Sequence, residues 1–289
     1  MITAALLAAL AALCNAVASV LQRDAARSVA PELGLRMALI WALIRHPVWL
    51  WGIAALIAGF VFQAAALSTG GIALVQPVLV VELPFTMIIL SWAFGAVLDR
   101  LSWLAIVTLS AGLAIFLMAA APGHGRWSPD TTEWIVATAV TAGTIAALVA
   151  VASATKGVTR PAALGVAAGL GFAFTATLIK KCTWIAQQDP GALLVSWPLY
   201  GMVAAGLCSL FLLQNALHSG TLVVAQPALT ISDPIAGILY GALMFGEPIR
   251  AGPWIVLEVA GIGLMVYGVI ELARSPLIQS QSPPTSARK

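Results

Sequence analysis

The nine residues QPVLVVELP, from Gln76 to Pro84, lie inside a long apolar run, yet they include an acid, an amide and two prolines. A closely similar stretch, QPALTISDP, follows 150 positions later, from Gln226 to Pro234. A helix that crosses a membrane normally excludes such residues, because lipid offers their polar groups no hydrogen-bond partners. A chain that contains this unfavourable segment twice is therefore expected to use both copies.

The composition indicates that lipid is part of the solvent of this chain. Of its 289 residues, 61% are hydrophobic and 9% are charged, whereas about 25% are charged in an average soluble domain. This is too little polar surface to cover a globule. We therefore expect an all-α, multi-pass protein of the cell (inner or plasma) membrane. The small formal charge of +3 does not indicate a nucleic-acid partner.

A span needs about 20 mostly apolar residues to cross the hydrocarbon layer. Charged residues, prolines and glycines bound nine stretches of sufficient length, and tryptophans lie near many of their ends, as is typical of the lipid–water boundary. The nine predicted spans are 2–22, 48–68, 71–97, 102–121, 133–152, 161–180, 193–213, 220–246 and 253–272.

One further segment, RMALIWALIR at 36–45, has only eight apolar residues between two arginines. It is too short to span a bilayer, so we expect a helix lying on the membrane surface near 33–46. The alternative is a tenth, shortened span buried by its neighbours.

The basic residues predict the orientation of the chain. With nine spans and a cytoplasmic C-terminus, ten lysines and arginines fall on the inner side and four on the outer side, an inside bias typical of membrane proteins. The four outer residues are Arg126, Lys180, Lys181 and Arg250. The tail at 274–289, rich in Ser, Pro and Gln, is expected to be disordered in the cytoplasm.

The two opening segments belong to a longer internal repeat. ALSTGGIALVQPVLVVELP aligns with ALHSGTLVVAQPALTISDP, and SAGLAIFLM aligns with VAGIGLMVY further on. Spans one to four then correspond to spans six to nine. Because the fifth span is odd, it inverts the second copy in the membrane, an arrangement found in many secondary transporters. We expect a first repeat at 1–121, a linker with the fifth span at 122–160, and a second, inverted repeat at 161–273.

Both segments fall near the middle of their spans. A carboxylate facing lipid at that depth costs at least ~2.5–3.5 kcal/mol, so Glu82 and Asp233 should face the bundle interior or a hydrated cavity. Gln76 and Gln226 could orient a bound solute there. Prolines remove backbone N–H donors and should free the carbonyls of residues four positions earlier; these prolines are Pro77, Pro84, Pro227 and Pro234, and the carbonyls are those of Ala73, Val80, Val223 and Thr230.

An oxygen-rich pocket of this kind would suit a proton, a cation or an amine-bearing solute. The structural alternative is that the prolines only kink their helices, that the acids bond neighbouring side chains, and that the glutamines join helices by hydrogen bonds.

Other polar residues are weaker candidates for a site. Asn15 and Gln63 could line a pathway, although hydrogen bonding between helices would also explain them. Glu258 could form a gate with Arg250. The pairs Asp99–Arg100 and Glu247–Arg250 are expected to be solvated charges in loops. Neither the cysteine spacing nor the histidine spacing fits a metal site, and no nucleophile–base pair stands out, so we expect no enzyme activity, cofactor or resident metal.

The paired segments resemble those of the drug/metabolite transporter superfamily. The resemblance is carried by QAAALSTGGIALVQPVLVVELPF and by LQNALHSGTLVVAQPALTISDPIAGILYGALMFGEPI, which ends in Gly246-Glu247 before a glycine-rich last span. Within the superfamily, LVQP and the HPVWLWG that follows the expected surface helix resemble an EamA-like bacterial branch, which is distantly similar to NIPA-type magnesium transporters of nine spans. Most superfamily members have ten helices, so the missing second helix is a departure from the pattern.

Together these features predict a secondary transporter that moves a small solute, such as a metabolite, an amine or a drug-like compound, by alternating access and with proton coupling as one option. The alternative is a divalent-cation transporter for magnesium-like ions, in which the same acids are direct ligands. A third interpretation is a membrane protein without transport activity, or an intramembrane enzyme. The sequence leaves open whether the chain forms a homodimer.

Overall fold

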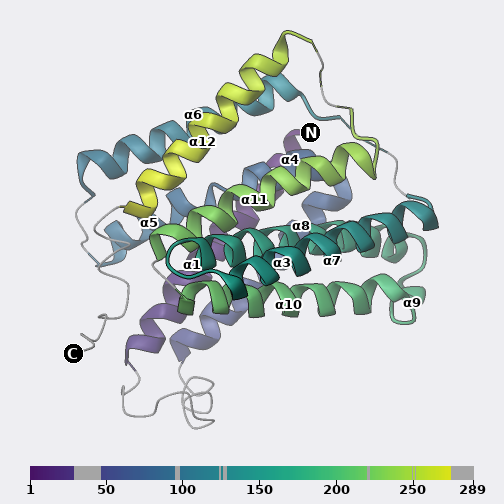
Figure 1. Cartoon of the computed structure of the whole chain (residues 1–289), viewed down its shortest axis with the longest axis horizontal. Helices are drawn as coiled ribbons and strands as arrows, with labels where there is room; N and C mark the ends of the chain where they lie inside the picture. The colour runs from purple at the N-terminus through teal and green to yellow at the C-terminus, as the bar shows by residue number, and fades with distance from the viewer. Residues whose placement is uncertain are drawn as a thin grey trace.

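The computed structural model describes residues 1–28, 47–94, 98–123, 125, 129–219, 222–248, 250 and 252–274. Within these residues the regular structure is helical, without a strand (Figure 1). The helices are α1 Ile2–Ser28, α3 Pro47–Thr69, α4 Ile72–Leu79, α5 Glu82–Phe94, α6 Arg100–Ala120, α7 Thr131–Ala154, α8 Thr159–Gln188, α9 Pro190–Leu193, α10 Trp197–Ser219, α11 Leu222–Leu243 and α12 Trp254–Arg274. The predicted surface helix near 33–46 and the tail beyond Arg274 lie outside the described residues.

Eight segments of the described residues are long and apolar enough to cross a membrane. They coincide with eight of the nine predicted spans, and α4 and α5 together make one of them, Ile72–Ala93. The segment that is not among the eight is α11. Its 22 residues extend ~33 Å at 1.5 Å per residue, but they include Gln226, Ser232, Asp233 and two prolines. The protein is thus a multi-pass helical membrane protein with one span-length helix of unusual polarity.

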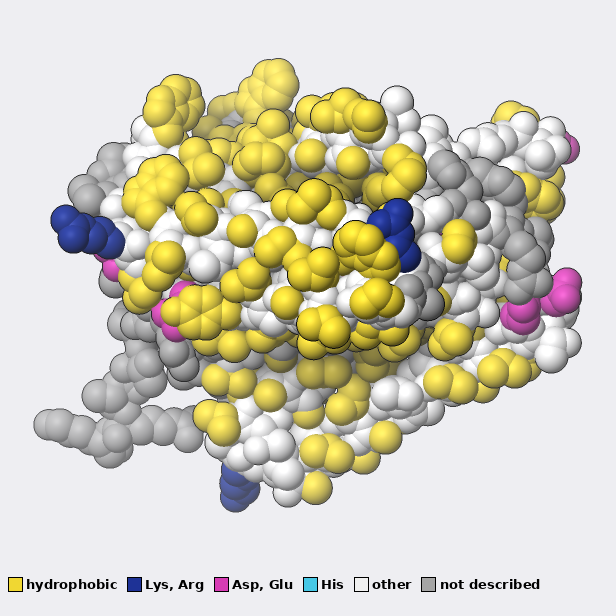
Figure 2. All heavy atoms as spheres, turned by 90° about the horizontal axis from the view of Figure 1, so that it is seen from above, with side chains coloured by type: hydrophobic (Ala, Val, Ile, Leu, Met, Phe, Trp, Pro, Cys, Tyr) yellow, Lys and Arg dark blue, Asp and Glu magenta, His cyan; other side chains and the backbone are white. Residues whose placement is uncertain are grey.

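The outer surface of the bundle is apolar. Figure 2 shows one face covered by hydrophobic side chains, with few charged ones. Only 11% of the span in α7 and 17% of the span in α10 is buried inside the protein, against 72% of the span in α8. Exposed apolar helix surface of this extent is stable only in contact with lipid, so α7 and α10 form the periphery and α8 the centre.

The contacts between helices occur in matching sets. Helix α1 packs against α3 and against α4 and α5, while α8 packs against α10 and α11. Helix α4 contacts α11, and α6 lies along α12, as the upper part of Figure 1 shows. Two of these pairs, α4 with α11 and α6 with α12, join spans that the predicted repeat aligns, and α7 packs mainly against α8.

The crossing of α6 and α12 depends on two glycines that occupy matching places in the aligned segments SAGLAIFLM and VAGIGLMVY. A Cβ atom added to Gly112 would lie 2.7 Å from the carbonyl oxygen of Gly261, and one added to Gly261 would lie 2.8 Å from the carbonyl oxygen of Gly112. The contact is therefore reciprocal, as at a two-fold axis. Small residues at such a crossing let two membrane helices approach at backbone distance.

We expect Gly261→Ala to destabilise the protein by about 1–3 kcal/mol, because the added methyl group has no room and must separate α6 from α12. Gly263→Ala is the matched control, since a Cβ atom there would meet nothing within 4 Å and alanine favours the helix. The thermal unfolding midpoints of the two variants in one detergent provide the comparison. A Gly261→Ala midpoint equal to that of the control would contradict the close crossing.

The sixth span extends further than predicted. The sequence places its end at residue 180 and assigns Lys180 and Lys181 to an outer loop, whereas α8 runs on to Gln188. Lys180 is only 2% exposed, so it belongs to the bundle interior. Counting it among the loop charges was wrong.

Candidate functional site

The first of the two polar segments breaks its helix. Helix α4 ends after Pro77, and α5 starts at Glu82. Short-range hydrogen bonds fill the break: Val80 N–H donates to the Pro77 carbonyl, and Leu83 N–H donates to the Val80 carbonyl at 3.2 Å. The predicted free carbonyl at Val80 is therefore wrong, because the tight turn at the break supplies it with a donor. The result is a discontinuous span whose halves meet at the acid.

The second polar segment keeps its helix intact. Helix α11 continues through both Pro227 and Pro234. The two polar segments thus differ in form: there is a break between α4 and α5, whereas α11 is a continuous helix that contains two prolines. Glycines on α8 let this helix come close: a Cβ atom on Gly169 would lie 2.9 Å from the Leu229 carbonyl and 3.0 Å from the Asp233 nitrogen.

The two acids lie near enough to interact between these elements. The Glu82 carboxyl interacts electrostatically with that of Asp233. The hydrogen-bond partner of the Glu82 carboxyl is the Asn15 amide of α1. Gln76 Nε2 donates to Asp233 Oδ1 at 3.2 Å. Gly237 provides the space for this contact, because a Cβ atom there would lie 2.5 Å from Gln76 Cγ. Four polar side chains from α1, α4, α5 and α11 thus form one cluster, which we call the carboxyl cluster.

The carboxyl cluster combines two acids with two amides. Both acids are partly buried, and Gln76 is only 2% exposed. Its carbonyl oxygen Oε1 is buried and has no hydrogen-bond partner among the described residues. A buried acceptor of this kind normally has a donor. Carboxylate and amide oxygens suit a proton, a hard cation or an ammonium group.

Several predicted site residues lie elsewhere. Gln226 is two turns before Asp233 on α11, so the rise along the helix separates them by ~10 Å, and Gln63 is partly buried on α3. The guanidinium of Arg250 lies 5.0 Å from the centre of the Trp254 ring. Glu258 Oε1 is buried without a hydrogen-bond partner in the described part of the chain. The proposed pair of Glu258 and Arg250 is therefore not formed.

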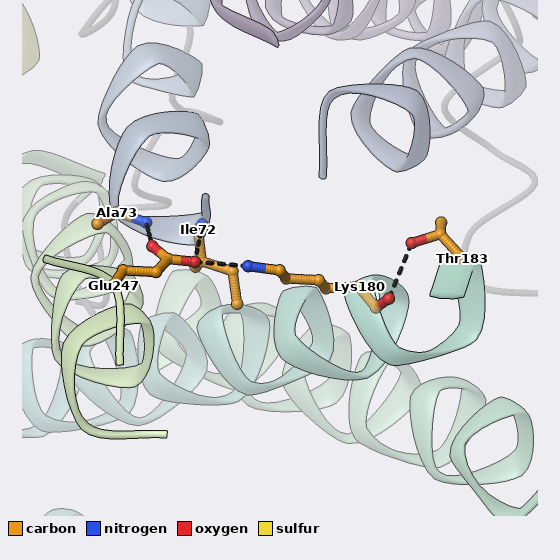
Figure 3. A network of polar contacts seen from close by, with 5 residues as sticks. All are labelled: Ile72, Ala73, Lys180, Thr183 and Glu247. Carbon is orange, nitrogen blue, oxygen red and sulfur yellow. Dashed lines mark hydrogen bonds and ion pairs between the residues drawn. The ribbon is translucent and has the colours of Figure 1, made fainter. Parts of the chain in front are cut away.

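Sequence reasoning missed a second polar site, formed by Glu247 and Lys180. The Lys180 ammonium is 2.5 Å from Glu247 Oε1, and both side chains are almost entirely buried. Figure 3 shows the carboxylate between this ammonium and the start of α4, where the N–H groups of Ile72 and Ala73 donate to it, each at 2.8 Å. The prediction that Glu247 is a solvated loop charge is wrong.

The end of α11 explains how Glu247 reaches this position. Gly246 has a φ of +56°, a conformation that glycine adopts easily. The Glu247 N–H can then donate to the Gly241 carbonyl at 2.9 Å, which closes the end of α11. The turn directs the Glu247 side chain back towards α4. Gly71 and Gly241 leave room for it, since a Cβ atom on either would lie within 2.6 Å of Oε2.

Three favourable terms offset the cost of burying this ion pair. The amide groups at the start of α4 and the partial positive charge of the helix N-terminus stabilise the carboxylate. The Lys180 ammonium lies 4.3 Å from the centre of the Phe245 ring, a cation–π contact. The pair joins α8, the α11–α12 turn and α4 at one end of the bundle, which we call the Glu247 end.

Asp99, the other acid that was predicted to be a solvated loop charge, lies at the surface. Asp99 is exposed, and its carboxylate accepts a hydrogen bond from the Ser102 N–H at 3.0 Å, which caps α6. Hydrogen bonds from the Ser102 side chain and backbone hold the pKa of Asp99 below its usual value. Local sequence does not separate Glu247 from Asp99, because both acids flank a helix end and lie close to an arginine.

Comparisons with known proteins leave the family open. The chain is 27% identical over 275 residues to an uncharacterized protein of Corynebacterium glutamicum, a match that covers 94% of each chain. No family model matches the chain. No solved structure matches it either.

Proposed function

We propose that this protein is a secondary transporter of the cell membrane, which moves a small solute by alternating access. The observation that carries the proposal is the carboxyl cluster, in which Glu82 of the broken α4–α5 span and Asp233 of α11 interact in the interior of a membrane protein. Ionisable residues at such depth generally serve substrate or ion pathways. Discontinuous helices at the midplane are a common construction of transporter sites.

The proposal includes an inverted repeat and membership of the drug/metabolite transporter superfamily, in its EamA-like branch. The matching contact sets and the reciprocal contact of Gly112 with Gly261 support the repeat. The basic residues support a cytoplasmic C-terminus, which a fluorescent-protein fusion at Lys289 would report by folding only inside the cell.

In this mechanism the carboxyl cluster binds the solute or its coupling proton, and the two ends of the bundle open in turn. The buried pair of Lys180 and Glu247 holds α4, α8 and α11 together at the Glu247 end. For that end to open, the carboxylate must leave either the ammonium or the N-terminus of α4. Asp233 is on α11, which is followed by the turn with Glu247, and Glu82 starts the helix after α4. A charge bound at the cluster can therefore alter the balance between the state in which the Glu247 end is closed and the state in which it is open.

A second candidate is transport of a hard divalent cation. The unpartnered Gln76 carbonyl and the two carboxyls supply oxygen ligands of the type magnesium prefers, with water completing the coordination. Within the described residues no group of three or more His, Cys, Asp or Glu side chains gathers, so the proteinaceous part of such a site would be limited to these oxygens.

Reconstitution distinguishes the two candidates. Purified protein is first screened by thermal shift against amines, amino acids and divalent ions, and hits are then tested for uptake into proteoliposomes. We expect saturable uptake of an organic solute that an imposed proton gradient accelerates. Saturable magnesium flux with no organic substrate would favour the second candidate, and liposomes that take up neither class above the protein-free background would contradict a transport function.

A further inference from the structure

A cavity lies at the Glu247 end, on the lipid-facing side of the bundle. It has a volume of about 710 Å³ and is lined by residues of three helices, α7, α8 and α10, together with the segment that precedes α7. This volume falls in the range of small-ligand sites. Because α7 and α10 are the two least buried spans, the cavity opens between helices that face lipid.

The lining of this cavity, which we call the crevice, contains charged groups and aromatic rings. Asp130, the N-cap of α7, contributes an exposed carboxylate. Lys181, near the end of α8, also lines the crevice, and its ammonium lies 4.3 Å from the centre of the Trp184 ring. Trp134 and Trp197 contribute indole rings, 5.2 Å apart and nearly perpendicular. Further along α7 the lining is apolar and includes Ile135, which is 64% exposed. One end of the crevice therefore has one negative and one positive charge, and the other end is apolar.

Trp134 adds an independent observation. Its side chain is only 5% exposed, and its indole Nε1–H is buried without an acceptor among the described residues. A buried indole N–H normally has a hydrogen-bond acceptor. The residue lines the crevice, so an acceptor group of a ligand held there would meet this requirement.

We propose that the crevice binds one zwitterionic phospholipid of the phosphatidylethanolamine type. The phosphate pairs with the Lys181 ammonium and accepts from the Trp134 indole, the primary amine pairs with the Asp130 carboxylate, and an acyl chain lies along Ile135 on α7. The charge pattern selects this headgroup, because an anionic lipid would place its second polar group against the Asp130 carboxylate without an ammonium to pair with it. Tryptophans at the lipid–water boundary are in the right position for such a contact.

The test is native mass spectrometry of the full chain in detergent, titrated with dioleoyl-phosphatidylethanolamine or with dioleoyl-phosphatidylglycerol. The two lipids share their acyl chains and differ in the headgroup. We expect one bound phosphatidylethanolamine, retained at about a tenfold lower concentration than phosphatidylglycerol, since one charged contact of this type corresponds to roughly that factor. Water-soluble phosphoethanolamine should not compete, because it lacks the chain that occupies the apolar end.

Two variants and one control assign the contacts. Lys181→Gln should weaken retention of phosphatidylethanolamine about tenfold. Asp130→Asn should abolish the preference between the lipids while leaving α7 capped, because asparagine is as good an N-cap as aspartate. Lys156→Gln, in the turn at the other end of α7, should change nothing. Equal retention of both lipids by the wild type, or an unchanged titration for Lys181→Gln, would overturn the proposal. So would competition by phosphoethanolamine, which would indicate a site for a soluble zwitterion.

Discussion

Glu82→Gln and Asp233→Asn are each expected to reduce solute uptake into proteoliposomes by about two orders of magnitude, the effect of deleting one charge from a buried charged contact. Both substitutions keep the size of the side chain. An asparagine at 233 can still accept the hydrogen bond of Gln76 through its carbonyl oxygen, and a glutamine at 82 can still bond Asn15. The unfolding midpoint should therefore remain close to that of the parent while transport is lost.

Asp99→Asn is the matched control for these variants. It removes an acid that is exposed and caps α6, and asparagine caps a helix equally well. Uptake by this variant should equal that of the parent. If Glu82→Gln and Asp233→Asn also transport like the parent, the acids are structural. If they lose transport together with their thermal transition, the loss reflects unfolding and the acids again have no specific role in transport.

Glu247→Ala is expected to lower the free energy of unfolding by about 3–5 kcal/mol. The substitution leaves the Lys180 ammonium buried without its counter-charge, which is far more costly than the net contribution of the pair. It also removes the acceptor from two N–H groups at the start of α4. Thermal or denaturant unfolding in detergent, followed by loss of monodisperse protein, measures the effect.

The double variant Lys180→Met/Glu247→Gln makes this prediction specific. It removes both charges, keeps an acceptor near α4 and fills the space of the lysine with an apolar chain, so much of the lost stability should return. Lys156→Met, at an exposed lysine, is the control and should leave stability unchanged. A double variant as unstable as the sum of its two singles would show that the ion pair has no energetic coupling.

For transport, the double variant should weaken closure of the Glu247 end and raise the reactivity of the native Cys182 thiol on α8 towards a water-soluble maleimide.

The carboxyl cluster was predictable because its cost is visible in the sequence. An acid in the middle of an apolar run must have a partner in the interior, and the repeat indicated that Glu82 and Asp233 come from matching helices. The two amides, Gln76 and Gln226, do not make matching contacts, however. Gln76 reaches Asp233 across the contact of α4 and α11, whereas Gln226 lies two turns away, because one span is broken and the other is continuous.

The Glu247 end could not be predicted from local sequence. Glu247 follows the end of a helix and precedes Pro248 and Arg250, a context typical of solvated turns. Its burial depends on Lys180, 67 positions earlier, and on the start of α4, about 175 positions earlier. Lys180 itself was assigned to a loop because the apolar run appeared to end there, although α8 continues. Each of the two charges is stable in the interior because the other pairs with it. The sequence around either residue gives no indication of its partner.

The central claim is that Glu82 of α5 and Asp233 of α11 lie close enough to interact. It is tested most directly by cross-linking in a variant whose three native cysteines, Cys14, Cys182 and Cys208, are replaced by serine. With cysteines at positions 82 and 233, a short bifunctional thiol reagent should join α5 to α11, as detected by mass spectrometry of the digested protein. The pair 82 and 239 should not react, because Leu239 is 53% exposed on the outer side of α11. Failure of the first pair to cross-link under conditions in which both thiols react with a monofunctional reagent would contradict the account.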